Sequence, residues 1–182
     1  LDILEQDDMP MMAEECEQNH NKEMNLAWQL IAKTDVSVFL TGKAGTGKTT
    51  FLRRLRELSP KRMVVLAPTG VAAINAQGQT IHSFFQLPTG PMVPGAQNKE
   101  TSHYRMSKDK KKLIRTLDRL VIDEISMVRC DLLDAVDQEL RMHRGINKPF
   151  GGVQLLLIGD LQQLPPVAKD SEWALLSPYY HT

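Results

Sequence analysis

Short apolar runs alternate along this chain with segments whose apolar residues recur every three or four positions. Leu52, Leu55 and Leu58 have the second spacing, which is typical of a helix. The apolar runs are rich in Val, Ile and Leu, as buried strands of parallel sheets are, and they cover residues 36–40, 61–67, 120–124 and 153–159. Strand and helix signals in this order predict an α/β domain with a mainly parallel sheet and helices on both faces.

Other segments complete the predicted outline. Helical spacing predicts helices at residues 23–32 and 132–142. Pro68 ends the second strand, and a helix of small residues follows it. Residues 86–107 are rich in Pro and Gly, which predicts a long loop. Residues 1–22 are acidic and rich in Met, so we expect an N-terminal tail or a loosely packed helix there, with no assigned function.

A glycine-rich stretch lies between the first strand and its helix. Residues 42–50 read GKAGTGKTT and match the phosphate-binding pattern G-x-x-x-x-G-K-[ST] at every fixed position. Glycines let backbone N–H groups approach phosphate oxygens, Lys48 adds a charge on the β- and γ-phosphates of ATP, and the Thr49 hydroxyl ligates Mg²⁺. A glycine turn that merely precedes a lysine is the alternative, and the flanking strand and helix disfavour it. The predicted nucleotide-binding residues are Gly42, Ala44, Gly45, Thr46, Gly47, Lys48, Thr49 and Thr50.

Two carboxylates end the third apolar run. Asp123 is predicted to hold Mg²⁺, through water, and Glu124 to activate the attacking water. An acidic pair here also fits a helix cap, since Ser126 and Asp131 precede an amphipathic segment. The phosphate-binding loop upstream favours the catalytic interpretation.

Gln163 follows the last apolar run, where ligands of parallel α/β sheets bind. Its amide can contact a γ-phosphate or position water. In isolation it would be an ordinary loop residue, but we predict a catalytic role because of the phosphate-binding loop.

Composition narrows the class of protein. The 182 residues suit one domain, and the 22 basic and 22 acidic residues leave no net charge, so a nucleic-acid site has to be a local patch. Cys16 and Cys130 match no metal spacing and favour a reducing, cytoplasmic location. No apolar run is long enough to span a membrane. Because the first residue is Leu1, we expect an excised piece of a longer protein.

Two segments are candidates for nucleic-acid contact. Residues 80–85 combine hydroxyls, a histidine and aromatic rings that suit a strand of nucleic acid, although local chemistry alone favours a tight turn with two core phenylalanines. Residues 99–119 carry a basic excess, which fits either a phosphate backbone or the solvated face of a helix that buries Leu113, Ile114 and Leu117.

The segments GKAGTGKTT, APTGVAAINAQGQTIHSFF, VIDEISMV and GDLQQLPPV, in this order, resemble the successive motifs of the Pif-type DNA helicases of superfamily 1B, relatives of the RecD helicases. The resemblance spans residues 38–167 and implies a RecA-like P-loop NTPase domain that hydrolyses ATP and moves 5′-to-3′ on single-stranded DNA. It also implies that Asp160 and Gln163 couple the nucleotide state to the DNA track, and it suggests work in DNA repair and telomere maintenance. The DNA-binding residues that it implies are Pro68, Thr69, Gly70, His82, Ser83 and Phe84.

The resemblance covers only part of such a helicase. Helicases of this type often read adenine with an upstream glutamine, for which Gln18 and Gln29 are candidates. They also need a second RecA-like domain, normally in the same polypeptide, and no second domain fits after Val167. Residues 23–182 are therefore expected to form the first RecA-like ATPase domain, with weak nucleotide binding, little hydrolysis and no unwinding alone. The helix after the phosphate-binding loop offers only poor substitutes for the missing arginine: Arg53, Arg54 and Arg56.

Two other functions remain open at this point. One is a P-loop ATPase or kinase that acts on a small molecule or a protein, although a kinase needs no water-activating Glu124. The other is a non-enzymatic module that binds DNA or a partner, against which the intact set of Lys48, Thr49, Asp123 and Glu124 argues.

Overall fold

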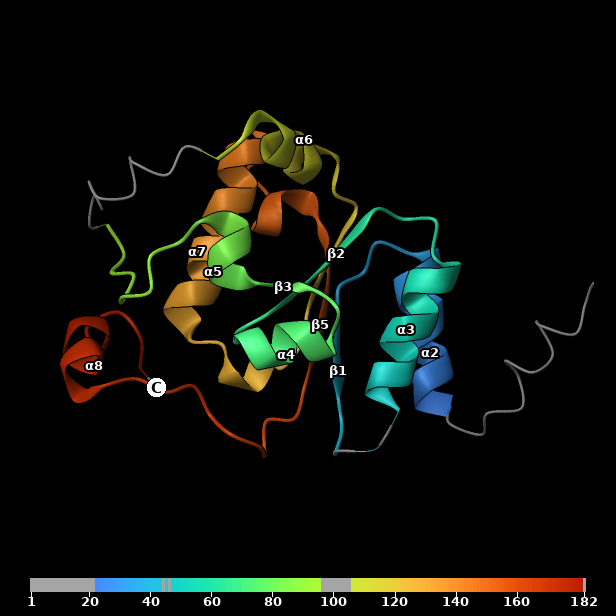
Figure 1. Cartoon of the computed structure of the whole chain (residues 1–182), viewed down its shortest axis with the longest axis horizontal. Coiled ribbons are helices and arrows are strands. Elements are labelled where there is room, and N and C mark those ends of the chain that lie inside the picture. Colours follow the sequence, from blue (N-terminus) through green and yellow to red (C-terminus); the bar gives the residue numbers. More distant parts are fainter. Residues whose placement is uncertain (1–21, 44, 46, 96–105, 182) are drawn as a thin grey trace, which may run out of the picture.

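One parallel sheet organises the domain. The structure, a computed structural model, describes residues 22–43, 45, 47–95 and 106–181. Over these residues the strands lie in the order β1-β5-β4-β2-β3, and every neighbouring pair is parallel (Figure 1). The strands are β1 (Val38–Thr41), β2 (Met63–Ala67), β3 (Gln79–Thr80), β4 (Arg119–Ile122) and β5 (Gln154–Gly159).

Helices cover both faces of this sheet. Figure 1 shows α2 and α3 on one side and α5, α6 and α7 on the other. The helices are α2 (Lys22–Lys33), α3 (Lys48–Leu58), α4 (Gly70–Asn75), α5 (Ile81–Phe85), α6 (Lys108–Thr116), α7 (Cys130–Arg144) and α8 (Asp170–Leu176), with the short 3-10 helices η2 (Ile125–Met127) and η3 (Pro149–Gly152). The predicted α/β architecture is confirmed. No helix of the described part is long and apolar enough to cross a membrane.

The alternation of side chains along the central strands creates two separate cores. Leu120 and Ile122 of β4 enter the core beneath α5, α6 and α7, whereas Val121 enters the core beneath α2 and α3. Each of these three side chains is fully buried. A strand that is apolar on both faces is the pattern expected for the centre of a parallel sheet.

The register of the strands brings three loops to one edge. Thr41 at the end of β1 pairs with Gly159 at the end of β5, and Ile122 at the end of β4 pairs with Leu157. The phosphate-binding loop, the Asp123–Glu124 pair and the segment after β5 therefore leave the same carboxyl edge of the sheet. This is where parallel α/β sheets bind their ligands.

The opposite edge of the sheet is held by a buried arginine. Arg119 is fully buried, and its guanidinium donates to the Gln154 side-chain oxygen (3.0 Å), the Ser59 hydroxyl (2.9 Å) and the Ile31 carbonyl. Gln154 in turn donates to the Thr34 carbonyl (2.9 Å). These bonds connect β4 and β5 to the ends of α2 and α3.

Some elements differ from the sequence-based expectation. Leu113 was expected to be buried with Ile114 and Leu117, but 40% of it is exposed because it lies on the flank of α6. β3 was not predicted, since two residues carry no periodicity. Of the expected loop 86–107, residues 86–95 contain no helix or strand, whereas residues 96–105 and the predicted tail at 1–21 lie outside the described residues.

Candidate nucleotide and DNA site

The phosphate-binding loop has the backbone geometry of an anion site. Gly45 and Gly47 adopt left-handed φ values of 80° and 87°. Gly47 is the N-cap residue of α3 and offers no side chain to accept the first N–H groups of this helix. Such N–H groups and the positive end of the helix dipole favour a phosphate. Ala44 and Thr46, two predicted contacts, lie outside the described residues.

Lys48 folds back over this loop. Its ammonium group donates to the carbonyl of Lys43 (2.8 Å) and to that of Gly42. Both acceptors are backbone oxygens with no formal charge, so a phosphate oxygen in the same place would be a stronger partner. The lysine is thus positioned by the loop that it is predicted to serve.

A cavity of about 360 Å³ joins the three loops at the carboxyl edge of the sheet. It brings five of the predicted nucleotide-binding residues together with both predicted carboxylates and Gln163, although these segments lie far apart in the sequence, whereas the predicted contact Gly42 does not line it. The residues that line it are Gly45, Gly47, Lys48, Thr49, Thr50, Asp123, Glu124, Gly159, Asp160 and Gln163.

The carboxylate pair is held by its own backbone. The N–H of Glu124 donates to an Asp123 carboxylate oxygen (3.0 Å). Burial raises the pKa of Asp123, and this hydrogen bond and the Lys48 charge partly offset the rise. Glu124 itself has the left-handed backbone angles φ 54° and ψ 44°, which are uncommon for residues other than Gly, Asn and Asp. The turn that aims the predicted catalytic carboxylate is therefore conformationally costly.

A glycine lets this turn approach the end of β5. A Cβ atom on Gly159 would lie 2.8 Å from the Ile125 Cγ2 atom and 3.1 Å from the Ile125 nitrogen. Both distances are too short for ordinary van der Waals contact, so the turn after Glu124 would have to move.

Replacing Gly159 with Ala is expected to lower ATP hydrolysis by about 10–100-fold while ATP affinity changes less, because a displacement near 1 Å costs this much when a reacting group is misplaced. Kinetic assays of kcat together with equilibrium nucleotide binding measure both effects. Gly90→Ala is the matched control, because a Cβ at Gly90 meets nothing within 4 Å. Equal kcat values for the two variants would show that Gly159 does not set the position of the turn.

Gln163 is bonded to Asp160 at the mouth of the cavity. Its side-chain amide donates to an Asp160 carboxylate oxygen (3.2 Å), and the other oxygen accepts from the Gln162 N–H (3.0 Å). Asp160 is buried, whereas Gln163 is exposed. The glutamine can therefore exchange its carboxylate partner for a phosphate oxygen without disturbing the core.

The predicted DNA residues lie on α4 and α5 and just before α4. Gly70 and Ser83 are exposed, and Pro68, Thr69 and His82 are partly exposed. The Thr69 hydroxyl caps α4 by accepting from the Ala72 N–H (3.2 Å). Burial and the nearby Arg129 charge lower the pKa of His82, against an opposing effect of Asp131. Their DNA contacts stay predictions.

Phe84 is different from the other predicted DNA residues. Only 1% of it is exposed, and its ring packs edge-to-face against Phe85 with centroids 4.8 Å apart. The ring belongs to the core, as local chemistry had suggested, and a base cannot stack on it in this conformation. What the resemblance implies for Phe84 stays a prediction.

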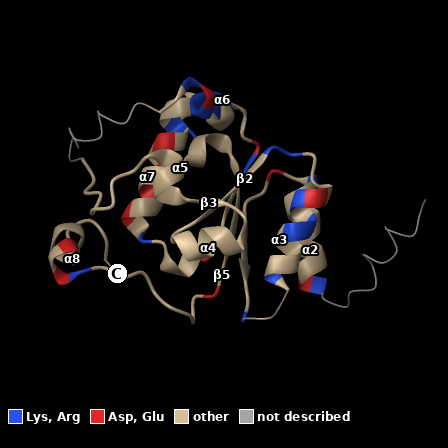
Figure 2. Cartoon of the chain, viewed as in Figure 1, with Lys and Arg blue, Asp and Glu red and all other residues tan. Residues whose placement is uncertain are grey.

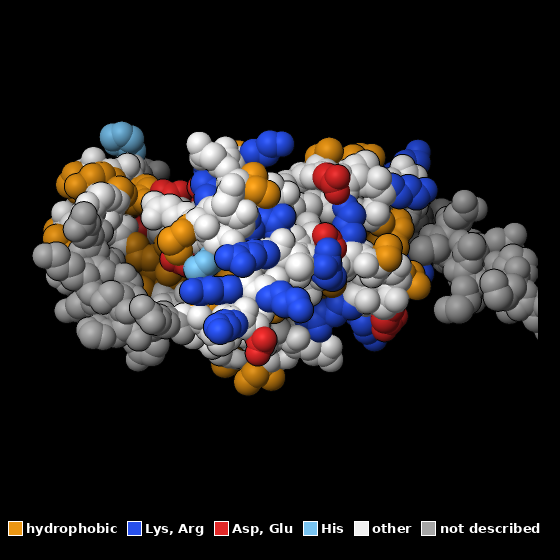
Figure 3. Space-filling model, turned by 90° about the horizontal axis from the view of Figure 1, so that it is seen from above, with side chains coloured by type: hydrophobic (Ala, Val, Ile, Leu, Met, Phe, Trp, Pro, Cys, Tyr) orange, Lys and Arg blue, Asp and Glu red, His pale blue; other side chains and the backbone are white. Residues whose placement is uncertain are grey.

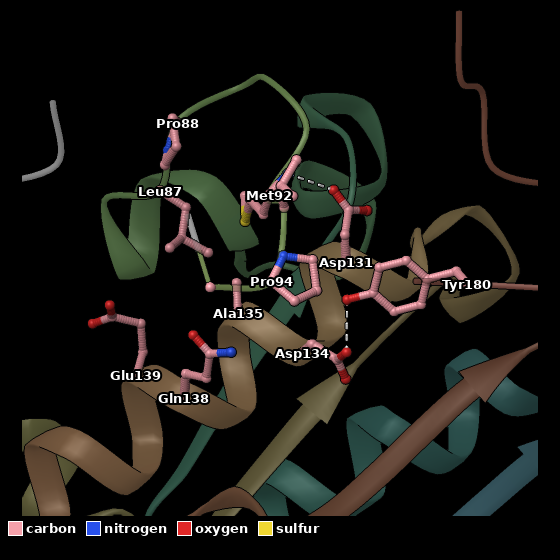
Figure 4. A pocket seen from close by; sticks show the side chains of 12 residues that line it. Leu87, Pro88, Met92, Pro94, Asp131, Asp134, Ala135, Gln138, Glu139 and Tyr180 are labelled. Carbon is pink, nitrogen blue, oxygen red and sulfur yellow. Dashed lines mark hydrogen bonds between the residues drawn. The ribbon is translucent and has the colours of Figure 1, made fainter. Parts of the chain in front are cut away.

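The sequence did not predict a charged cluster that joins the start of α7 to α8. Arg129 donates to both carboxylate oxygens of Asp131 (3.0 and 2.8 Å) and to Glu172 of α8 (3.3 Å). Asp131 also accepts from the Met92 N–H (2.9 Å), which ties the loop before residue 96 to α7 (Figure 4). Tyr180 closes the same region with a hydrogen bond to Asp134 (2.8 Å; Figure 4). From the sequence, Asp131 was the only member of this cluster that we singled out, as a possible helix cap.

One of the two glutamine candidates for reading adenine lies in the described part of the chain. Gln29 is exposed on α2, and Gln18 lies outside the described residues. α2 does reach the phosphate-binding loop, since the Met24 methyl group lies 3.9 Å from the position of a Cβ on Gly47.

The parallel sheet, the glycine loop before α3 and the carboxylates after β4 define a P-loop NTPase domain of the RecA-like type. A family model described as PIF1-like helicase matches residues 7–175. The chain belongs to the PIF1-like helicase family.

Individual relatives agree with this assignment. The human ATP-dependent DNA helicase PIF1 is 44% identical over 142 residues, which cover 75% of this chain and 21% of the human protein. The Pif1 helicase of Bdellovibrio bacteriovorus is 39% identical over 152 residues, or 81% of this chain and 34% of that protein. The chain thus spans about a fifth to a third of the length of these relatives.

Solved structures show the same fold. Bacteroides sp Pif1 in complex with ADP-AlF4 and Bacteroides Pif1 bound to ssDNA both superimpose with a TM-score of 0.82 and 48% sequence identity. Each match covers 89% of this chain and 37% of the Bacteroides chain.

Proposed function

We propose that residues 23–182 form the first RecA-like motor domain of an ATP-dependent DNA helicase that moves 5′-to-3′ on single-stranded DNA. The observation that supports this most directly is the single cavity shared by Lys48, Thr49, Asp123, Glu124 and Gln163. A glycine turn, a helix cap and a loop glutamine would each explain one of these segments, but none of them explains why the fold brings all of them together.

The residues of this cavity fit ATP and Mg²⁺. The uncapped start of α3 and the Lys48 ammonium supply donors and positive charge for the phosphates. Thr49 offers a hydroxyl oxygen of the kind that Mg²⁺ takes as a ligand, Asp123 would hold the ion through a bound water, and further water and phosphate oxygens complete such sites. When bound, the metal ion neutralises charge that develops on the phosphates.

The remaining polar residues have separate roles in this proposal. We assign the role of general base, which accepts a proton from the attacking water, to Glu124. The other carboxylate, that of Asp123, already accepts a hydrogen bond from the Glu124 N–H. Gln163 leaves Asp160 to contact the γ-phosphate, so its position depends on the nucleotide state. Because Thr69 and Gln163 line one further cavity beside the active site, a movement of Gln163 can be transmitted to the start of α4.

The DNA partner is proposed from the exposed residues of α4 and α5. Gly70 and Ser83 offer N–H and hydroxyl donors for phosphate oxygens, without a base-reading surface. The similar Bacteroides Pif1 binds ssDNA, which favours single-stranded DNA over a small molecule as the partner.

A second RecA-like domain is part of this proposal. The relatives are several times longer than the matched segment, which leaves room for that domain in the same polypeptide. In this proposal it also supplies the arginine for the γ-phosphate, and Arg56 of α3 is a poor substitute because it already donates to the carbonyl oxygens of Ala76 and Gln77.

The test is ATP hydrolysis by the 182-residue chain and by the full-length protein that contains it, with and without single-stranded oligothymidine. We expect little hydrolysis by the chain and strong stimulation by DNA in the longer protein, lost in a Lys48→Ala variant because the phosphates lose their charged partner. Steady hydrolysis that ignores DNA would support an ATPase with another substrate, and robust unwinding by the chain alone would contradict the need for a second domain.

A further inference from the structure

The outer face of α6 carries four cations and no ion pair. Lys108, Lys111, Lys112 and Arg115 recur at i, i+3, i+4 and i+7, which places them along one side of the helix. The buried Ile114 lies on the other side and packs into the core. None of the four cations forms a salt bridge in the part of the chain that the structure describes. We call these four residues the α6 basic face.

This arrangement is unfavourable for the helix itself. Lys108 with Lys112 and Lys111 with Arg115 are like-charge pairs at i, i+4, which destabilise a helix. Lys108, Lys110 and Lys111 also lie in the first four positions, where the helix dipole is positive and favours anions. An ordinary solvated face gains stability from alternating signs, and this one has only Asp109 as a local acid.

α6 lies away from the ATP site and contacts α5, which carries predicted DNA-binding residues. α6 leads into the start of β4, and so lies near the amino edge of the sheet, whereas the phosphate-binding loop leaves the carboxyl edge (Figure 1). Lys110 connects α6 to α5, since its ammonium group donates to the Ser83 carbonyl (3.0 Å) and lies 5.2 Å from the centre of the Phe84 ring. Lys110 lies about 200° around the helix from Lys108 and Lys112, so a nucleic acid on the basic face lies across α6 from Ser83, about one helix diameter (10–12 Å) away.

Neighbouring cations extend this surface, although the chain as a whole has no net charge. Arg144 of α7 donates to the carbonyl oxygens of Ile114 (2.9 Å) and Leu117 (2.8 Å) at the end of α6. Lys and Arg colour much of α6 in Figure 2, and Figure 3 shows them gathered on the face seen from above, with few acidic side chains among them.

We propose that the α6 basic face is a second DNA-contact surface, which binds the phosphate backbone of double-stranded DNA beside the single-stranded track. Seven residue steps along the helix span roughly 10 Å, which matches about three nucleotides of one strand of a duplex. Single strands are held by bases stacked on exposed aromatic rings, and the aromatic ring that lies against Lys110 of α6, that of Phe84, is buried. α6 itself carries charge and no aromatic residue, and such a surface suits a duplex, whose bases are already stacked.

This inference rests on the proposed function only in that DNA is the polymer, and its test needs no ATP. Fluorescence anisotropy would measure binding of the 182-residue chain to a blunt duplex and to a single strand with the same number of phosphates, from 50 to 200 mM salt. The variant is Lys108→Gln/Lys111→Gln/Lys112→Gln. The matched control is Lys22→Gln/Lys33→Gln/Lys169→Gln, which removes three exposed lysines elsewhere.

For the α6 variant we expect duplex affinity to fall by at least about tenfold at 50 mM salt, and the slope of log K against log salt to become shallower by roughly two to three. The control and single-strand binding should change little, and the melting temperature of the α6 variant should not fall, because like-charge repulsion is removed. Unchanged duplex affinity would overturn the proposal, and an equal loss for single strands would overturn the choice of a duplex. Either result leaves the ATPase test of the motor domain unaffected.

Discussion

Replacing Glu124 with Gln is expected to lower ATP turnover by about 10²–10⁴-fold, the usual contribution of a general base, with ATP binding retained. The amide keeps the size of the carboxylate and cannot accept the proton of the attacking water. Lys48 remains available to bind the phosphates, and Asp123 remains available to hold the metal ion. Steady-state hydrolysis with single-stranded DNA, in the full-length protein, measures turnover, and equilibrium titration with ATP measures binding.

A matched control is available at the penultimate residue of α3. Glu57→Gln removes an exposed carboxylate of the same type and should leave both quantities unchanged. Turnover that survives in the Glu124 variant would remove the role assigned to this residue and would move the search for a base to Asp160. Loss of ATP binding would instead indicate that Glu124 holds the nucleotide or the turn around it.

Replacing Arg129 with Ala is expected to lower the free energy of unfolding by about 3–5 kcal/mol, the range for a buried ion pair that loses one partner. The Asp131 side chain is fully buried, and only 16% of the Arg129 side chain is exposed. The variant leaves Asp131 with the Met92 N–H and without a counter-charge. Urea unfolding followed by circular dichroism gives the change.

The exposed pair of Arg62 and Asp118 supplies the comparison. Its side chains are 60% and 40% exposed, and Arg62→Ala should cost about 0–1 kcal/mol. The double variant Arg129→Ala/Asp131→Ala should be more stable than the sum of the single effects predicts, because the unpaired carboxylate is gone. The pKa of His82 should also rise in the Arg129 variant, since the Arg129 charge lowers it. Equal losses for Arg129 and Arg62 would refute the structural role of the buried pair.

Much of the candidate nucleotide site could be predicted from local sequence, because its parts are short segments with their own physical signatures. The phosphate-binding loop and the run that ends in Asp123 each needed only a few neighbouring residues to be recognised. Their meeting in one cavity follows from parallel strands, which bring their carboxyl ends to the same edge.

The rest depends on contacts between residues that are distant in the sequence. Arg119 forms hydrogen bonds with Ser59 and Gln154, which are 60 and 35 positions away in the sequence. Its sequence neighbours do not indicate that it is buried. Charged residues are usually exposed, so a sequence reader places both Arg119 and Arg129 on the surface. The burial of Phe84 and the close approach at Gly159 likewise become visible only when the partner element is in place.

The left-handed backbone of Glu124 has an evolutionary consequence. A glutamate in this conformation is less stable than a glycine or an asparagine would be, so the backbone alone would favour one of those two residues at this position. If hydrolysis is what retains it, descendants of this domain that have lost turnover should drift toward Gly or Asn at this position while they keep the glycine loop. The residue at position 124 would then distinguish domains that hydrolyse ATP from those that have lost hydrolysis, among otherwise similar sequences.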